Sequence, residues 1–148
     1  MTTTDQHIIF LLAAMLAADA AKSAPGASGL SPEKQLAMDD VLQKRFPGLS
    51  DRERWDQVAA AIQGRTGFGG GIGFLKAIEK SGRKVASGLK RDTAKCYRLI
   101  KQLKTIAESD GKVTVQEMHV LRSASNSLGL GKTLRISHTD TAITLAQA

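Results

Sequence analysis

Apolar side chains recur every three or four positions over most of this chain, which is the spacing of one face of an α-helix. Aromatic residues make up only 4% of the chain, so aliphatic residues and alanine must fill the core, a mixture that favours closely packed helices over sheets. A length of 148 residues fits one domain. The sequence therefore predicts an all-α, single-domain helical bundle of about six or seven helices.

Breaks in the apolar pattern divide the chain into predicted elements. Capping-box spacing marks two helix starts, at residues 50–53 and 114–117. The six glycines of residues 64–73 predict a hinge, and Gly82 and Gly88 are expected to weaken the helix that follows. In chain order, the predicted helices cover about residues 4–22, 31–46, 50–62, 74–91, 92–109 and 114–128.

These helices are expected to form one domain over residues 1–131, with an insertion near residues 20–29. Residues 132–148 alternate weakly and are expected to form a tail: a frayed helix, a short packed segment or a disordered one.

The first helix contains an apolar run, residues 8–18, of the kind found in secretory signals. Residues 1–7 include Asp5 and no Lys or Arg, and the run is too short to span a bilayer, so we interpret it as a buried helix. A single cysteine, Cys96, stands in an apolar helical pattern, which indicates a packed thiol in a reducing compartment. A cytoplasmic location is expected.

Residues 106–117 join two predicted helices through a short acidic turn. Gly111 permits a left-handed backbone, Val113 can enter the core, and Glu117 can point back toward Asp110. Two carboxylates there suit a hard cation, although Ile106 stands where an EF-hand needs its leading aspartate. The structural alternative is a helix C-terminus followed by a capping box.

This turn resembles that of the TerB-like family, helical domains named after a tellurite-resistance protein, in which an Asp-Gly turn precedes an apolar residue, Ser or Thr, and Glu. A second such turn is divided between residues 16–19 and 30–33 by the insertion. The resemblance implies an all-helical bundle, a role in bacterial stress or tellurite resistance, and no established catalysis. It also implies a divalent cation, Ca²⁺, Mg²⁺ or Zn²⁺, bound by Asp110, Glu117, Asp19 and Glu33.

The chain carries 21 Lys and Arg against 14 Asp and Glu, a net charge of +7 that attracts anionic partners. Many of these charges surround the predicted helix over residues 74–91. The structural interpretation is a core helix with solvated lysines. The functional alternative is an adaptor that docks on an anionic membrane surface or on nucleic acid. Its anion-binding residues would be Lys76, Lys80, Arg83, Lys84, Lys90 and Arg91.

Glycine-rich segments at residues 69–73 and 129–133 do not match either nucleotide-binding fingerprint. No Ser/His/Asp set or carboxylate pair suggests catalysis, so no catalytic residue is assigned. The sequence therefore predicts a binding or scaffold module with a protein partner rather than an enzyme, and it does not specify an oligomeric state.

Overall fold

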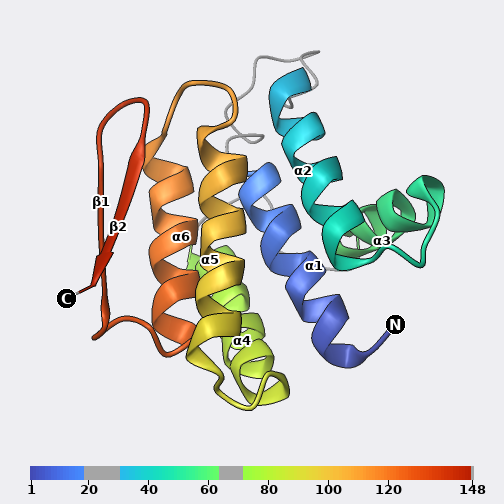
Figure 1. Ribbon diagram of the computed structural model, residues 1–148, viewed down its shortest axis with the longest axis horizontal. Helices are drawn as coiled ribbons and strands as arrows, with labels where there is room; N and C mark the ends of the chain where they lie inside the picture. The colour runs from blue at the N-terminus through green and yellow to red at the C-terminus, as the bar shows by residue number, and fades with distance from the viewer. Residues whose placement is uncertain (19–30, 64–71, 148) are drawn as a thin grey trace.

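The computed structural model describes residues 1–18, 31–63 and 72–147, and within them it confirms the predicted helical bundle (Figure 1). In these described ranges, six helices are followed by one small antiparallel sheet. The elements are α1 Thr3–Leu16, α2 Pro32–Arg45, α3 Asp51–Gln63, α4 Ile72–Gly88, α5 Thr93–Glu108, α6 Val115–Ser127, β1 Leu134–His138 and β2 Ile143–Gln147.

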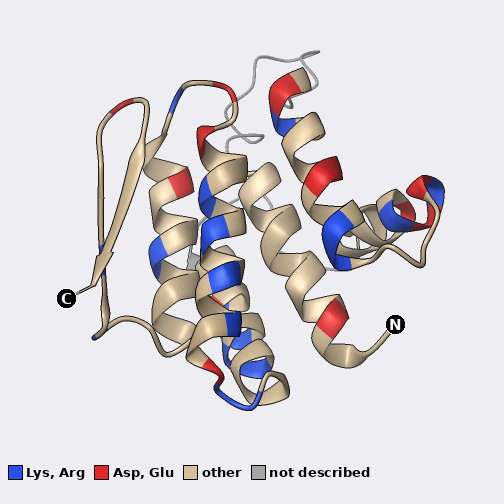
Figure 2. Ribbon diagram, viewed as in Figure 1, with Lys and Arg blue, Asp and Glu red and all other residues tan. Residues whose placement is uncertain are grey.

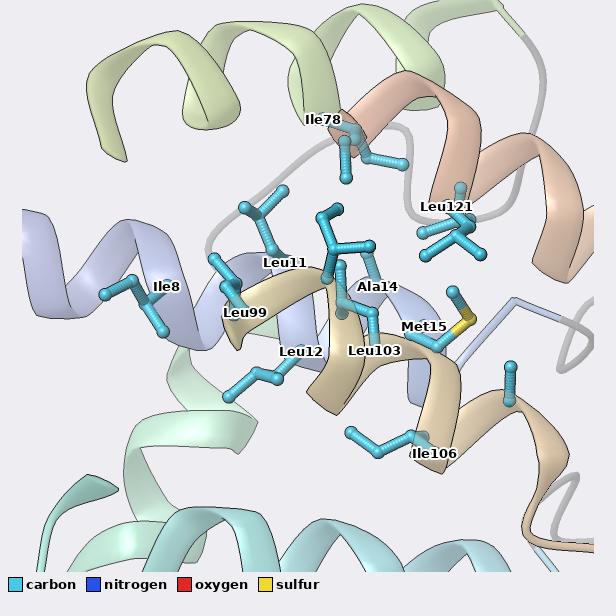
Figure 3. Packing of buried hydrophobic residues seen from close by; sticks show 14 of the residues in the cluster. Ile8, Leu11, Leu12, Ala14, Met15, Ile78, Leu99, Leu103, Ile106 and Leu121 are labelled. Carbon is cyan, nitrogen blue, oxygen red and sulfur yellow. The ribbon is translucent and has the colours of Figure 1, made fainter. Parts of the chain in front are cut away.

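Helix α1 is the centre of the bundle. All ten residues from His7 to Leu16 are buried, because the other five helices pack around it. Helices α4 and α5 lie on opposite sides of α1 and pack on it rather than on each other (Figures 1 and 3). In Figure 3, Leu11, Leu12 and Met15 of α1 lie among apolar side chains of α4, α5 and α6. No helix of the described residues is both long and apolar enough to cross a membrane.

Local hydrogen bonds of the capping residues mark where helices begin. Both predicted capping boxes are present: at the start of α3, Glu53 N donates to Ser50 Oγ (3.2 Å) and Ser50 N donates to Glu53 Oε1 (3.1 Å). The prediction that the first helix continues to residue 22 is wrong, since α1 ends at Leu16 and residues 17–18 form a turn. A run of alanines favours a helix but does not define where it stops.

Helix α4 differs from the sequence prediction in where it begins and in its continuity at Gly82. The expected hinge over residues 64–73 is wrong for residues 72 and 73, which belong to α4, while residues 64–71 lie outside the described residues. The helix expected to be weakened by Gly82 and Gly88 continues without a break through Gly82 and ends at Gly88. A Cβ atom added there would lie 2.7 Å from Ser127 Cβ, and one added at Gly88 would lie 2.8 Å from Thr4 Cγ2. These glycines therefore allow α4 to approach α6 and the start of α1 closely.

The chain after α6 forms a β-hairpin, which was not predicted. Leu134 pairs with Gln147 and His138 with Ile143. Leu134, Ile136 and Ile143 are buried, so one face of the hairpin packs on the bundle beside α6 (Figure 1). The end of α5 and the α5–α6 turn hold the hairpin near the loop between its strands: Ile143 N donates a hydrogen bond to Glu108 Oε2 (2.6 Å), and Val113 N donates one to Asp140 O (2.7 Å).

Candidate functional site

The acidic turn between α5 and α6 has the local structure that the sequence predicts. Gly111 has a φ of +79°, Asp110 Oδ1 accepts a hydrogen bond from Lys112 N (3.1 Å), and Val113 is buried. At the start of α6, Glu117 N donates to Thr114 Oγ1 (3.2 Å), while Thr114 N donates to Glu117 Oε1 (2.9 Å). The capping box therefore engages one oxygen of the Glu117 carboxylate.

The second oxygen of Glu117 lies beside a lysine from another helix. Lys34 Nζ is 2.7 Å from Glu117 Oε2, and the two side chains are 5% and 0% exposed, so this is a buried ion pair. Lys34 is the third residue after the cap Ser31, whose Oγ accepts from Lys34 N (3.1 Å), and Glu117 stands third after the cap Thr114. The two turns thus place a lysine and a glutamate at equivalent positions, and the ammonium group supplies a cation next to Glu117.

The other predicted cation ligands have different surroundings. Glu33 precedes Lys34 but is exposed, Asp110 is half-buried in its own turn, and Asp19 lies outside the described residues. The described part of the chain contains no group of three or more His, Cys, Asp or Glu residues that could hold a metal ion. A cation bound by Asp110 and Glu117 therefore stays a prediction of the sequence.

Helix α4 is a core helix with a basic outer face. Phe74, Ile78 and Val85 are buried where α4 packs on α1 and α6. The predicted anion-binding residues of α4 and the turn after it are all exposed: Lys76, Lys80, Arg83, Lys84, Lys90 and Arg91. An apolar face that is already packed cannot insert into lipid, so α4 presents its exposed charges to a partner.

Helix α5 carries further positive charge, which was not predicted from the sequence as part of a binding surface. Every third residue from Lys95 to Lys104 is basic, a spacing that places these side chains next to one another on a helix. Lys95, Arg98 and Lys101 are exposed. Figure 2 shows basic residues at intervals along α5. The basic surface is defined here as Lys76, Lys80, Arg83, Lys84, Lys90, Arg91, Lys95, Arg98 and Lys101.

The basic surface is poorly neutralised. Residues 72–104 contain ten Lys or Arg and only two Asp or Glu. Among these ten, within the described part of the chain, only Lys104 forms an ion pair, with Glu108 (2.8 Å). A surplus of this size in one third of the sequence creates a local positive potential that favours anionic partners.

The turn that joins the two basic helices has an unusual backbone. Lys90 and Arg91 both have a φ of +56°, the left-handed region that normally favours glycine. Arg91 N donates to Ala86 O (2.8 Å) and Lys90 N to Ser87 O (3.0 Å), which is the hydrogen-bond pattern of a Schellman C-cap. Two basic residues thus occupy positions where glycine would remove the backbone strain of a positive φ.

A groove of about 640 Å³ lies beside the basic face of α5. We call it the Tyr97 groove. It is lined by Thr93, Ala94, Tyr97, Leu130, Thr133, Leu134 and Gln147. Lys101 Nζ lies over the Tyr97 ring, 5.6 Å from its centre, as in a cation–π contact. The sequence gives no local signal for this groove, because its walls come from α5, the chain after α6 and the end of β2.

Cys96 is buried, as predicted for a packed thiol. Burial raises the pKa of the Cys96 thiol, and the nearby Asp92 carboxylate raises it further. The thiol therefore stays protonated near neutral pH, which does not favour a nucleophilic role.

Comparison with known proteins gave no match to any family model, curated protein or solved structure. The resemblance to the TerB-like family accordingly rests on the residues of the two acidic turns.

Proposed function

We propose that this protein is a non-catalytic helical module that binds phosphate-bearing polyanions through the basic surface. The observation that carries the proposal is the excess of ten basic over two acidic residues in residues 72–104, with nine of the basic side chains in the basic surface. Phosphate groups attract such a surface mainly through charge and the release of counterions. The role in stress or tellurite resistance, and the protein partner, stay predictions of the sequence.

The arrangement of the charges also supports binding rather than simple solvation. The basic side chains follow α4 and α5, and the short turn that contains Lys90 and Arg91 connects the two rows. Because the apolar side of α4 is packed in the core, the basic surface is fixed in position before a partner arrives. A fixed set of charges loses less conformational entropy on binding than a flexible tail does.

The test measures binding of the full chain to fluorescent single-stranded and duplex oligonucleotides and to vesicles containing phosphatidylserine, over a range of salt concentrations. We expect binding to at least one of these polyanions at low salt, with affinity that falls steeply as salt rises. The double variant Lys80→Glu/Arg83→Glu should bind more weakly and show a shallower salt dependence.

The matched control reverses charge away from the basic surface. Lys112 and Lys44 are exposed and lie outside the basic surface, on the α5–α6 turn and on α2. Lys112→Glu/Lys44→Glu changes the net charge by the same amount and should have a much smaller effect. An equal loss of affinity in the control would show that net charge alone drives binding. No binding to any polyanion at low salt would refute the proposal.

A further inference from the structure

We infer that the polyanion is a single-stranded nucleic acid, one base of which enters the Tyr97 groove while its phosphates contact the basic residues of α5. This inference rests on the proposed function and adds the class of partner.

The groove places an aromatic ring directly beside a row of positive charges. Tyr97 precedes Arg98 in the sequence, and Lys101, one helical turn later, holds its ammonium group 5.6 Å from the centre of the Tyr97 ring. Tyr97 is half-buried, so the ring is held in place but still lines open space. An aromatic platform next to a basic track is the combination by which proteins bind single strands without sequence preference.

The lining of the groove suits a nucleobase better than a phosphate. Among the described residues, no charged side chain lines it: Ala94, Leu130 and Leu134 give apolar walls, whereas Thr93, Thr133 and Gln147 add hydroxyl and amide groups. These polar groups can both donate and accept hydrogen bonds, as the edge of a base requires. The volume of about 640 Å³ lies in the usual range for small-ligand sites, so it has room for one base.

Duplex nucleic acid and an anionic lipid surface, the two other phosphate-bearing partners, would not place a group in the Tyr97 groove. In a duplex the bases are paired and stacked, so a ring in a lateral groove could receive one only after unpairing. A lipid headgroup needs charge alone, and the apolar face of α4 that would enter the acyl region is packed on α1 and α6. Only a single strand offers phosphates and free base faces together.

The test compares fluorescence anisotropy of a labelled single-stranded oligonucleotide, its duplex and phosphatidylserine vesicles. The variants are Tyr97→Leu, which removes the ring, and Tyr97→Phe, which keeps it. We expect Tyr97→Leu to weaken single-strand binding about tenfold, as loss of one stacked base does, and Tyr97→Phe to remain within about twofold of the parent. Duplex and vesicle binding should be the same in all three proteins.

A second variant covers the case in which Tyr97→Leu fails to fold. Ala94 is exposed on α5 and lines the groove, so Ala94→Leu narrows the space while keeping the Tyr97 ring in the chain, and it should also weaken single-strand binding about tenfold. Parent-like single-strand affinity in Ala94→Leu, or in a folded Tyr97→Leu, would overturn the inference and leave polyanion binding intact. Binding to the duplex or to vesicles, without binding to the single strand, would likewise overturn the inference and leave polyanion binding intact. Absence of binding to all three probes would remove the proposed function as well.

Discussion

Lys34 Nζ and Glu117 Oε2 lie 2.7 Å apart in the interior, and this ion pair connects the first turn of α2 to the first turn of α6. The Glu117 carboxylate also accepts a hydrogen bond from Thr114 N in the capping box. One carboxylate therefore caps the start of α6 and contacts α2. A positive charge near a helix N-terminus is unfavourable by itself, because the helix dipole is positive there. The buried carboxylate offsets that effect for Lys34.

We predict that breaking this pair destabilises the fold strongly. Lys34→Met and Glu117→Gln should each lower the free energy of unfolding by about 3–5 kcal/mol, since each leaves a buried charge without its partner. The double variant should cost less than the sum of the two, which chemical denaturation can measure as a double-mutant cycle.

The control for this cycle is the exposed pair of Lys44 and Asp40, in which Nζ and Oδ2 are 3.0 Å apart. Lys44→Met should cost less than about 1 kcal/mol, as surface ion pairs usually do. Strictly additive effects of the Lys34 and Glu117 substitutions would show that the two groups do not interact.

A second prediction concerns divalent cations. The Lys34 ammonium group next to Glu117 repels a cation, so Ca²⁺, Mg²⁺ and Zn²⁺ should leave the melting temperature of the parent chain and of Asp110→Ala unchanged. Differential scanning calorimetry with each metal measures this directly. A metal-dependent rise in the parent that Asp110→Ala abolishes would instead support the cation site expected from the TerB-like resemblance.

A third prediction contrasts two glycines of α4. Alanine normally stabilises a helix interior by about 1 kcal/mol relative to glycine. At Gly82 the new Cβ would lie 2.7 Å from Ser127 Cβ, so Gly82→Ala should instead lower stability, by about 1–3 kcal/mol. At Gly73 nothing lies within 4 Å of the new Cβ, and Gly73→Ala should be neutral or stabilising. Thermal melts compare the two, and Ser127→Gly should restore part of the loss in Gly82→Ala.

A fourth prediction uses the strained turn. Lys90→Gly should raise the free energy of unfolding by about 0.5–1 kcal/mol, because glycine adopts a positive φ without steric cost. Lys80→Gly, in the interior of α4, should lower it by about 1 kcal/mol. Both remove one charge from the basic surface, so both should weaken polyanion binding. A Lys90→Gly variant that is less stable than the parent would contradict the strain argument.

A fifth prediction follows from the raised pKa of Cys96. The folded thiol holds its proton more tightly than the unfolded one, whose pKa is about 8.5. Its contribution to stability is therefore complete below that pH and is lost as the pH rises through the higher folded pKa. The parent should lose more stability than Cys96→Ala between neutral pH and about pH 10, as urea denaturation at each pH would show. Equal losses would mean that Cys96 does not titrate differently in the two states.

The sequence by itself determined the helices, the capping boxes, the left-handed turn at Gly111 and the exposed charges around α4. These features depend on residues within about four positions of one another, because helix caps and apolar periodicity are local. The same local rules predicted a helix weakened at Gly82, and they did not show that α4 continues through this glycine because it packs closely on Ser127 of α6.

Only the tertiary structure decided the rest. The lysine that pairs with Glu117 comes from α2, and the small residue at position 82 is needed because α6 approaches it. The hairpin is held by Glu108 at the end of α5 and by Val113 of the α5–α6 turn. The Tyr97 groove likewise forms where α5 lies beside the segment after α6 and the end of β2. Such contacts join segments far apart in sequence, so their residues become partners only when packing of the apolar core has fixed how the helices lie against one another.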